Sequence, residues 1–105
     1  MNNYETLFIL DPEIPEEEID TQIGRITSYV EKAGGSVVDT DRWGMRRMAY
    51  EIRKKRQGFY VLMTFHANSP SIQDIDADFK LDQRVLRHII VRREDGGQPV
   101  KEREE

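Results

Sequence analysis

Cysteine is absent from this chain of 105 residues. Its absence excludes disulfides, thiolate zinc sites and thiol catalysis, and it is compatible with a reducing compartment. Long apolar runs are also missing, and none approaches the roughly 18 residues of a membrane-spanning helix, so we expect no membrane partner. The first residues lack the basic and apolar segments of a secretory signal. The length fits one domain with one hydrophobic core.

Charge is distributed unevenly along the chain. The net charge is −4 and the pI about 5.2. Residues 42–56 nevertheless carry seven basic residues and one acid, and residues 84–93 carry four arginines and no acid, so the rest of the chain is strongly acidic. Six of those acids lie in residues 11–20. This pattern argues against a generally basic nucleic-acid binder but leaves a localised polyanion site open.

Hydrophobic periodicity predicts four strands and two helices. Segments rich in β-branched, aromatic and aliphatic residues predict strands at 4–10, 36–52, 59–67 and 85–93. A helix is predicted to begin near Pro15, bury Ile19, Ile23, Ile26 and Val30, and end at Gly34-Gly35.

A second helix is predicted after residue 68, with Ile72, Ile75 and Phe79 on its apolar side. Its N-terminus has two candidate caps. Ser71 and Asp74 match a capping box, and Ser69 before Pro70 is the alternative.

The order strand, helix, strand, strand, helix, strand predicts an α+β, ferredoxin-like βαββαβ domain over residues 1–94, followed by a charged, disordered tail at 95–105. Right-handed crossovers place both helices on one face of a four-stranded antiparallel sheet. Three strands are apolar at both odd and even positions, so the opposite face is expected to expose apolar side chains to a partner. The alternative is that long side chains and the tail cover that face.

Residues 74–85 superficially resemble a calcium-binding loop, but Phe79 stands where glycine is needed and Val85 where a bidentate glutamate is needed. We therefore expect no metal and interpret Asp74, Asp78 and Asp82 as a solvated helix face. His66 and His88 lack a catalytic signature and are interpreted as strand residues with satisfied rings. No nucleophile elbow, paired carboxylates or phosphate loop is present, which predicts no enzyme, no catalytic residue and no cofactor.

Residues 43–60 combine apolar and aromatic residues with a basic cluster at 53–56 and the pair Gln57-Gly58. We interpret them as a strand end, a turn and a strand start, with a cationic tip suited to a polyanion. A solvated hairpin turn is the alternative. The third strand lacks the RNP1 pattern for stacking bases on a sheet, so phosphate contacts from the loops and the last strand are favoured.

Three segments of the chain match a known pattern. They are R-W-G-M-R-R-M-A-Y-E-I-R-K-K-R-Q-G-F-Y from Arg42 to Tyr60, and Y-E-T-L-F-I-L-D-P and V-L-R-H-I-I-V-R at the two ends. On these segments the chain resembles the bacterial ribosomal protein S-six family (small ribosomal subunit protein six). The resemblance covers residues 3–93. Met48 replaces a common leucine, a tolerable exchange, and His88 replaces a common aliphatic residue.

The resemblance implies a structural component of the small ribosomal subunit in the cytoplasm. Its partners would be the central domain of the small-subunit ribosomal RNA and the small basic ribosomal protein S-eighteen, with the chain a monomer within the ribosome. By position, the rRNA-binding residues would be Lys54, Lys55, Arg56, Arg87, Arg92 and Arg93. The protein-partner-binding residues would be Trp43, Met45, Arg47, Met48 and Tyr50. A self-associating ferredoxin-like domain, regulatory or enzymatic, is the alternative function.

Overall fold

The computed structural model describes residues 1–93, so the tail predicted at 95–105 lies outside the described residues. The elements are β1 (Asn2–Leu10), a 3-10 turn (Glu16–Glu18), α1 (Ile19–Lys32), β2 (Ser36–Ile52), β3 (Lys55–Ala67), a second 3-10 turn (Ser69–Ser71), α2 (Ile72–Leu81) and β4 (Val85–Arg93). All six predicted helices and strands are present. The predicted bounds of β2 and β4 are reproduced, and β3 begins four residues earlier than predicted.

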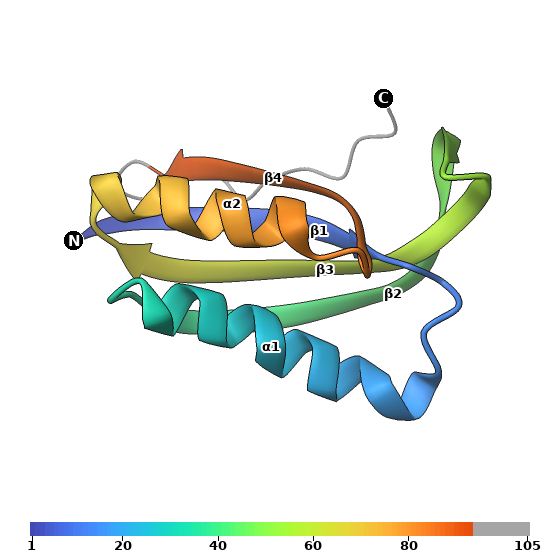
Figure 1. Cartoon of the computed structure of the whole chain (residues 1–105), viewed down its shortest axis with the longest axis horizontal. Helices are drawn as coiled ribbons and strands as arrows, with labels where there is room; N and C mark the ends of the chain where they lie inside the picture. Colours follow the sequence, from blue (N-terminus) through green and yellow to red (C-terminus); the bar gives the residue numbers. More distant parts are fainter. Residues whose placement is uncertain (94–105) are drawn as a thin grey trace.

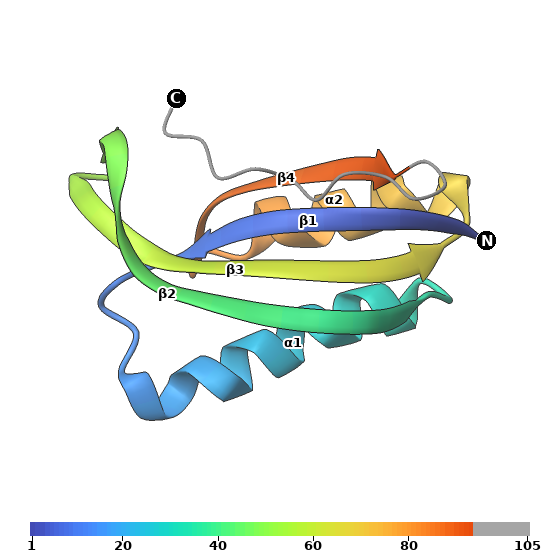
Figure 2. The same ribbon diagram turned by 180° about the vertical axis from the view of Figure 1, so that it is seen from behind.

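The strands form one antiparallel sheet in the order β2-β3-β1-β4. Both helices cover one face of it (Figure 1), and the opposite face is seen without helices in Figure 2. The predicted ferredoxin-like topology is confirmed. β1 lies between two strands, which explains why every residue from Tyr4 to Leu10 is buried. None of the helices in residues 1–93 is long and apolar enough to cross a membrane.

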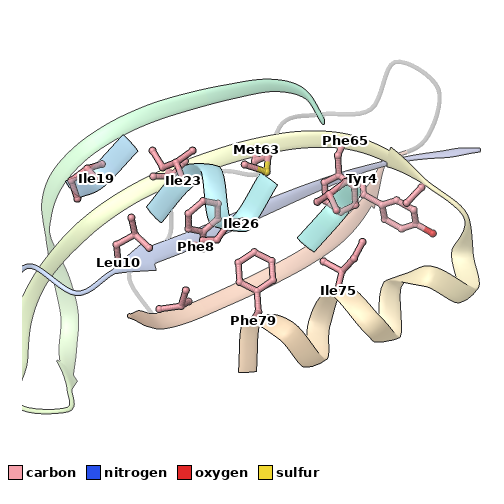
Figure 3. Close-up of a cluster of buried hydrophobic side chains, with 14 residues drawn as sticks. Tyr4, Phe8, Leu10, Ile19, Ile23, Ile26, Met63, Phe65, Ile75 and Phe79 are labelled. Carbon is pink, nitrogen blue, oxygen red and sulfur yellow. The ribbon is translucent and has the colours of Figure 1, made fainter. Parts of the chain in front are cut away.

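The main core lies between the helices and the sheet (Figure 3). The predicted stripe of α1 is confirmed, because Ile19, Ile23, Ile26 and Val30 are all buried. Phe79 of α2 packs against Phe8 of β1 with ring centroids 5.5 Å apart. This core fixes the helices on the sheet and leaves the other face to the β2–β3 hairpin.

A second apolar cluster occupies part of the face without helices. Its buried members are Leu7, Ile9, Met48, Tyr60 and Leu86, with Trp43, Ile52 and Leu62 packed against them. The hairpin continues past the end of β1 and bends there (Figure 2). The bend follows a register shift at Gly44, whose φ is +92°.

The predicted exposed apolar face is therefore only partly correct. Side chains of the bent hairpin cover one part of the sheet, while Ile89 and Val91 remain 40% and 42% exposed. The second cluster is not visible in the strand pattern, because it depends on how far β2 and β3 extend beyond β1.

The predicted cap of α2 is wrong. Ser71 makes no side-chain capping hydrogen bond. The alternative, Ser69, is the first residue of the preceding 3-10 turn rather than its cap, and the cap there, Asn68, makes none either. The reason is that the 3-10 turn Ser69–Ser71 precedes α2 and already places Ser71 in the helical region, with φ −73° and ψ −16°. A capping hydroxyl needs an extended backbone to reach the next N–H groups.

Candidate nucleic-acid and protein interfaces

The hairpin tip is a two-residue turn. Ile52 pairs with Lys55, and the two residues between them, Arg53 and Lys54, have φ values of 53° and 66°. Positive φ at both positions matches a type I′ turn, whose usual residues are asparagine and glycine. Lys55 and the residues after it therefore belong to β3 rather than to the predicted longer turn.

Gly58 lies within β3 because β1 leaves no room for a side chain there. A Cβ atom at position 58 would collide with Cγ2 of Ile9 and crowd the carbonyl oxygen of Leu10. The glycine that the sequence placed in the turn thus serves the close approach of β3 to β1.

The four basic residues of the tip differ in their contacts. The Arg53 guanidinium donates to the carbonyl oxygens of Gln83 (2.7 Å) and Val85 (3.4 Å). Lys55 Nζ lies 2.6 Å from Glu13 Oε2 and 3.3 Å from Asp11 Oδ1. The hydrogen bond to Glu13, and then that to Asp11, raise the pKa of Lys55.

Arg56 Nη2 lies 3.1 Å from Glu51 Oε2, so its charge also has a carboxylate beside it. Lys54 makes no hydrogen bond or ion pair with any described residue. Of the three residues predicted to bind RNA at the tip, Lys54 is the one whose charge is not compensated.

The predicted arginines of β4 lie apart from the tip residues and on different faces. Arg87 stacks over the Tyr50 ring at 5.6 Å and donates to its hydroxyl. Arg93 Nε lies 2.8 Å from Oε1 of the buried Glu5, in ion-pair contact but outside hydrogen-bond geometry. Both are at odd positions of β4, so alternation places Arg92, which donates to Asn2 Oδ1, on the opposite face.

The residues predicted to bind a protein partner divide into supporting and exposed positions. Met48 is only 6% exposed and belongs to the second apolar cluster. The half-buried Trp43 ring lies parallel to Tyr60, with centroids 6.5 Å apart. Met45 and Tyr50 are 48% and 47% exposed.

Arg47 is exposed too and has no partner among residues 1–93. β2 is an edge strand whose outer side pairs with no described strand. Its exposed side chains and unpaired backbone groups together form a surface suited to another polypeptide.

His88 joins β4 to α2. Its Nε2 lies 2.6 Å from Asp76 Oδ1, and its ring stacks on Phe79 with centroids 4.6 Å apart. The predicted satisfied ring at position 88 is confirmed. The hydrogen bond from His88 is the largest cause that holds the pKa of Asp76 below its ordinary value of 3.8.

Asp82 corrects the predicted solvated acidic face, because it is buried. Its Oδ2 accepts hydrogen bonds from Gln22 Nε2 at 2.8 Å and from the Tyr29 hydroxyl at 2.7 Å. Burial and then the bond to Asp82 raise the pKa of Tyr29 to about 12. Asp82 follows the last residue of α2, so it leaves the helix stripe and turns toward α1.

A shallow cavity of about 370 Å³ lies beside this network, between α1 and the end of α2. Arg25 and Arg84 line it. Neither side chain makes a hydrogen bond or ion pair with a described residue, and sequence reasoning singled out neither as a site. Within residues 1–93, no group of His, Asp and Glu is arranged to hold a metal ion.

Comparison with known proteins identifies the family. The family model for ribosomal protein S6 matches residues 3–92. The small ribosomal subunit protein bS6 of Carboxydothermus hydrogenoformans is 41% identical over 92 residues, 88% of this chain and 96% of that protein. That of Clostridium acetobutylicum is 41% identical over 91 residues, 87% of this chain and 96% of that protein.

A crystal structure of 30S ribosomal protein S6 from Thermotoga maritima has a TM-score of 0.82 at 30% identity, covering 88% of this chain and 87% of that one. The topology, the matched segment and the curated relatives agree. The chain therefore belongs to the ribosomal protein S6 family (the S-six family of the resemblance), and it is a small-subunit ribosomal protein, located in the ribosome in the cytoplasm, and not an enzyme.

Proposed function

We propose that this chain binds the central domain of the small-subunit ribosomal RNA together with the small basic ribosomal protein S-eighteen. The observation that carries the proposal is the hairpin arm, which extends past β1 and ends in the uncompensated cation Lys54. A cationic tip that projects from an otherwise acidic chain reaches a phosphate backbone with little repulsion from the body.

The burial of side chains on the two central strands favours RNA contact through phosphates over bases stacked on the sheet. Sheet-type RNA recognition needs exposed aromatics on those strands. On the face without helices, Tyr60 of β3 is 2% exposed, and Leu7 and Ile9 of β1 are each 8% exposed. The second apolar cluster thus occupies the place where bases would stack.

The outer side of β2 suits a basic protein partner. Met45 and Tyr50 supply exposed apolar surface, and the exposed carboxylate of Asp39 supplies negative charge on the same edge strand. Opposite charges across an interface speed association and fix its register. The acidity of the chain as a whole favours a basic partner in the same way.

The positive charge of β4, the other edge strand of the sheet, favours a monomer. β4 and the residue before it carry Arg84, Arg87, Arg92 and Arg93 without an acid. Two such edges brought side by side would repel each other. Sheet-to-sheet pairing between copies of this chain is therefore disfavoured, and a molecular mass near 12.4 kDa is expected in solution.

The test is RNA affinity with and without the partner. The chain alone should bind the central-domain RNA weakly, and S-eighteen should strengthen binding. Affinity should fall with salt by about 0.9 log unit per log unit of salt for each phosphate neutralised on duplex, and less on single strands. Equally tight binding without S-eighteen would refute the cooperative proposal.

A further inference from the structure

The turn at the hairpin tip has residues that its backbone does not favour. Arg53 and Lys54 both adopt positive φ, a region that side chains with a Cβ atom avoid. Asparagine followed by glycine would fit the same type I′ turn without strain. Backbone strain of this kind, retained at a charged position, is a reason to look for a function in the two side chains.

Arg53 is exposed, but its guanidinium is held by two backbone carbonyls. Its two terminal nitrogens donate to the carbonyl oxygens of Gln83 and Val85, the residues on either side of Arg84. The planar guanidinium can reach both carbonyls at once, which a lysine ammonium could not do with the same fixed geometry. The contact ties the tip of the hairpin to the start of β4, across 30 and 32 residues of sequence.

This contact brings two uncompensated cations to the same end of the molecule. Lys54 follows Arg53 directly, and Arg84 lies between the two carbonyls that Arg53 holds. The Arg84 backbone is fixed as well, because its N–H donates to Asp82 Oδ1 at 3.0 Å and its carbonyl accepts from the Asp11 N–H at 2.9 Å. Neither Lys54 nor Arg84 has a side-chain partner within residues 1–93.

We propose that Lys54 and Arg84 form a two-point phosphate-binding site, and that Arg53 is the positioning residue that holds the two cations together. The proposal rests on the proposed function in that the phosphates belong to ribosomal RNA. It adds Arg84 to the RNA-contacting surface. It also assigns Arg53 and Lys55 to fixing the hairpin, because the carbonyls of residues 83 and 85 and the carboxylates of Asp11 and Glu13 occupy them.

The main test is the double variant Arg53→Asn/Lys54→Gly, which retains an optimal type I′ turn but removes both the positioning contact and one cation. Thermal unfolding should occur at an equal or higher temperature. On a duplex, the logarithm of the binding constant falls by about 0.9 per log unit of salt for each phosphate contact. If affinities at 1 M salt are equal, each lost contact therefore weakens binding about fivefold at 0.15 M salt.

Losing Lys54 should thus weaken binding about fivefold and reduce the salt slope by about 0.9, because Arg84 stays fixed by its contacts to Asp82 and Asp11. The matched control is Lys32→Gln, which removes a cation at the C-terminal end of α1, far from the hairpin tip (Figure 1), and should change neither value. Wild-type affinity and slope in the double variant would overturn the site.

A mutant cycle separates positioning from direct binding. Arg84→Ala and Lys54→Ala are measured in the wild type and in Arg53→Asn. If Arg53 positions the two cations, each alanine variant should cost less in the Arg53→Asn background. Additive effects would show that Arg53 acts independently of them, and would overturn its positioning role.

Two RNA probes keep the proposal separate from the proposed function. All variants are measured on central-domain ribosomal RNA with S-eighteen and on poly(U). Tip-dependent binding to poly(U) without binding to ribosomal RNA would refute the proposed function and support the phosphate site. Tip-independent binding to both RNAs would overturn the site and leave the proposed function in place, and a wild type that binds neither RNA would refute both.

Discussion

Met48→Ala is expected to destabilise the fold strongly, whereas Met45→Ala, three residues earlier in β2, should not. Met48 is 6% exposed and packs in the second apolar cluster, while Met45 is 48% exposed. Burial of a methionine side chain makes its truncation cost about 2–5 kcal/mol. The cluster is small and lies on an open sheet face that can partly collapse, so we expect the lower half of that range, about 2–3 kcal/mol.

A loss of that size lowers the melting temperature by about 10–20 °C for a domain of this length. Thermal or urea unfolding, followed by the circular dichroism of the sheet, measures both variants. Met45→Ala should stay within about 0.5 kcal/mol of the wild type and should instead weaken binding of S-eighteen. Equal stability losses in the two variants would refute the division of β2 into a supporting side and an exposed side.

Two further substitutions test contacts within the fold. Asp76→Asn should lower the free energy of unfolding at pH 7 and make it decline less steeply in acid. The pKa of Asp76 is depressed in the folded state, so its carboxylate stabilises the fold above about pH 3.8, and this stabilisation is lost as the pH falls through the folded-state pKa. Parallel plots of melting temperature against pH for the two proteins, from pH 2 to 7, would contradict this. Gly58→Ala should cost about 1–3 kcal/mol through the collision with Ile9 and Leu10. The control Gly24→Ala has open space around its Cβ in α1 and should stabilise the fold by about 0.5–1 kcal/mol in urea unfolding; equal effects of the two glycine variants would contradict the close approach.

Local pattern predicted the elements of this fold well, because each helix and strand buries side chains at its own period. The apolar stripe of α1 and the buried run of β1 are examples. The family resemblance carried the function, which periodicity does not encode.

Features that depend on distant segments were not predictable in the same way. Asp82 looks like one more exposed acid until α1 brings Gln22 and Tyr29 to its carboxylate. The basic cluster looks uniform in sequence, yet carboxylates lie beside Lys55 and Arg56, and two carbonyls hold Arg53. Lys54 alone in the cluster has no hydrogen bond or ion pair with residues 1–93. Charge along the sequence therefore located the candidate site but did not identify which cations remain free.

The central place of β1 has a consequence for synthesis. β1 is made first, yet its nearest pairing partner is Phe59 of β3, and its other neighbour, β4, ends at Arg93. Loop-closure entropy must be overcome before such distant pairings form. The apolar β1 segment is thus made without strand partners, and the sheet is completed only after Arg93 has been translated. A ribosomal protein with this strand order must tolerate an unpaired hydrophobic strand until β3 has been made.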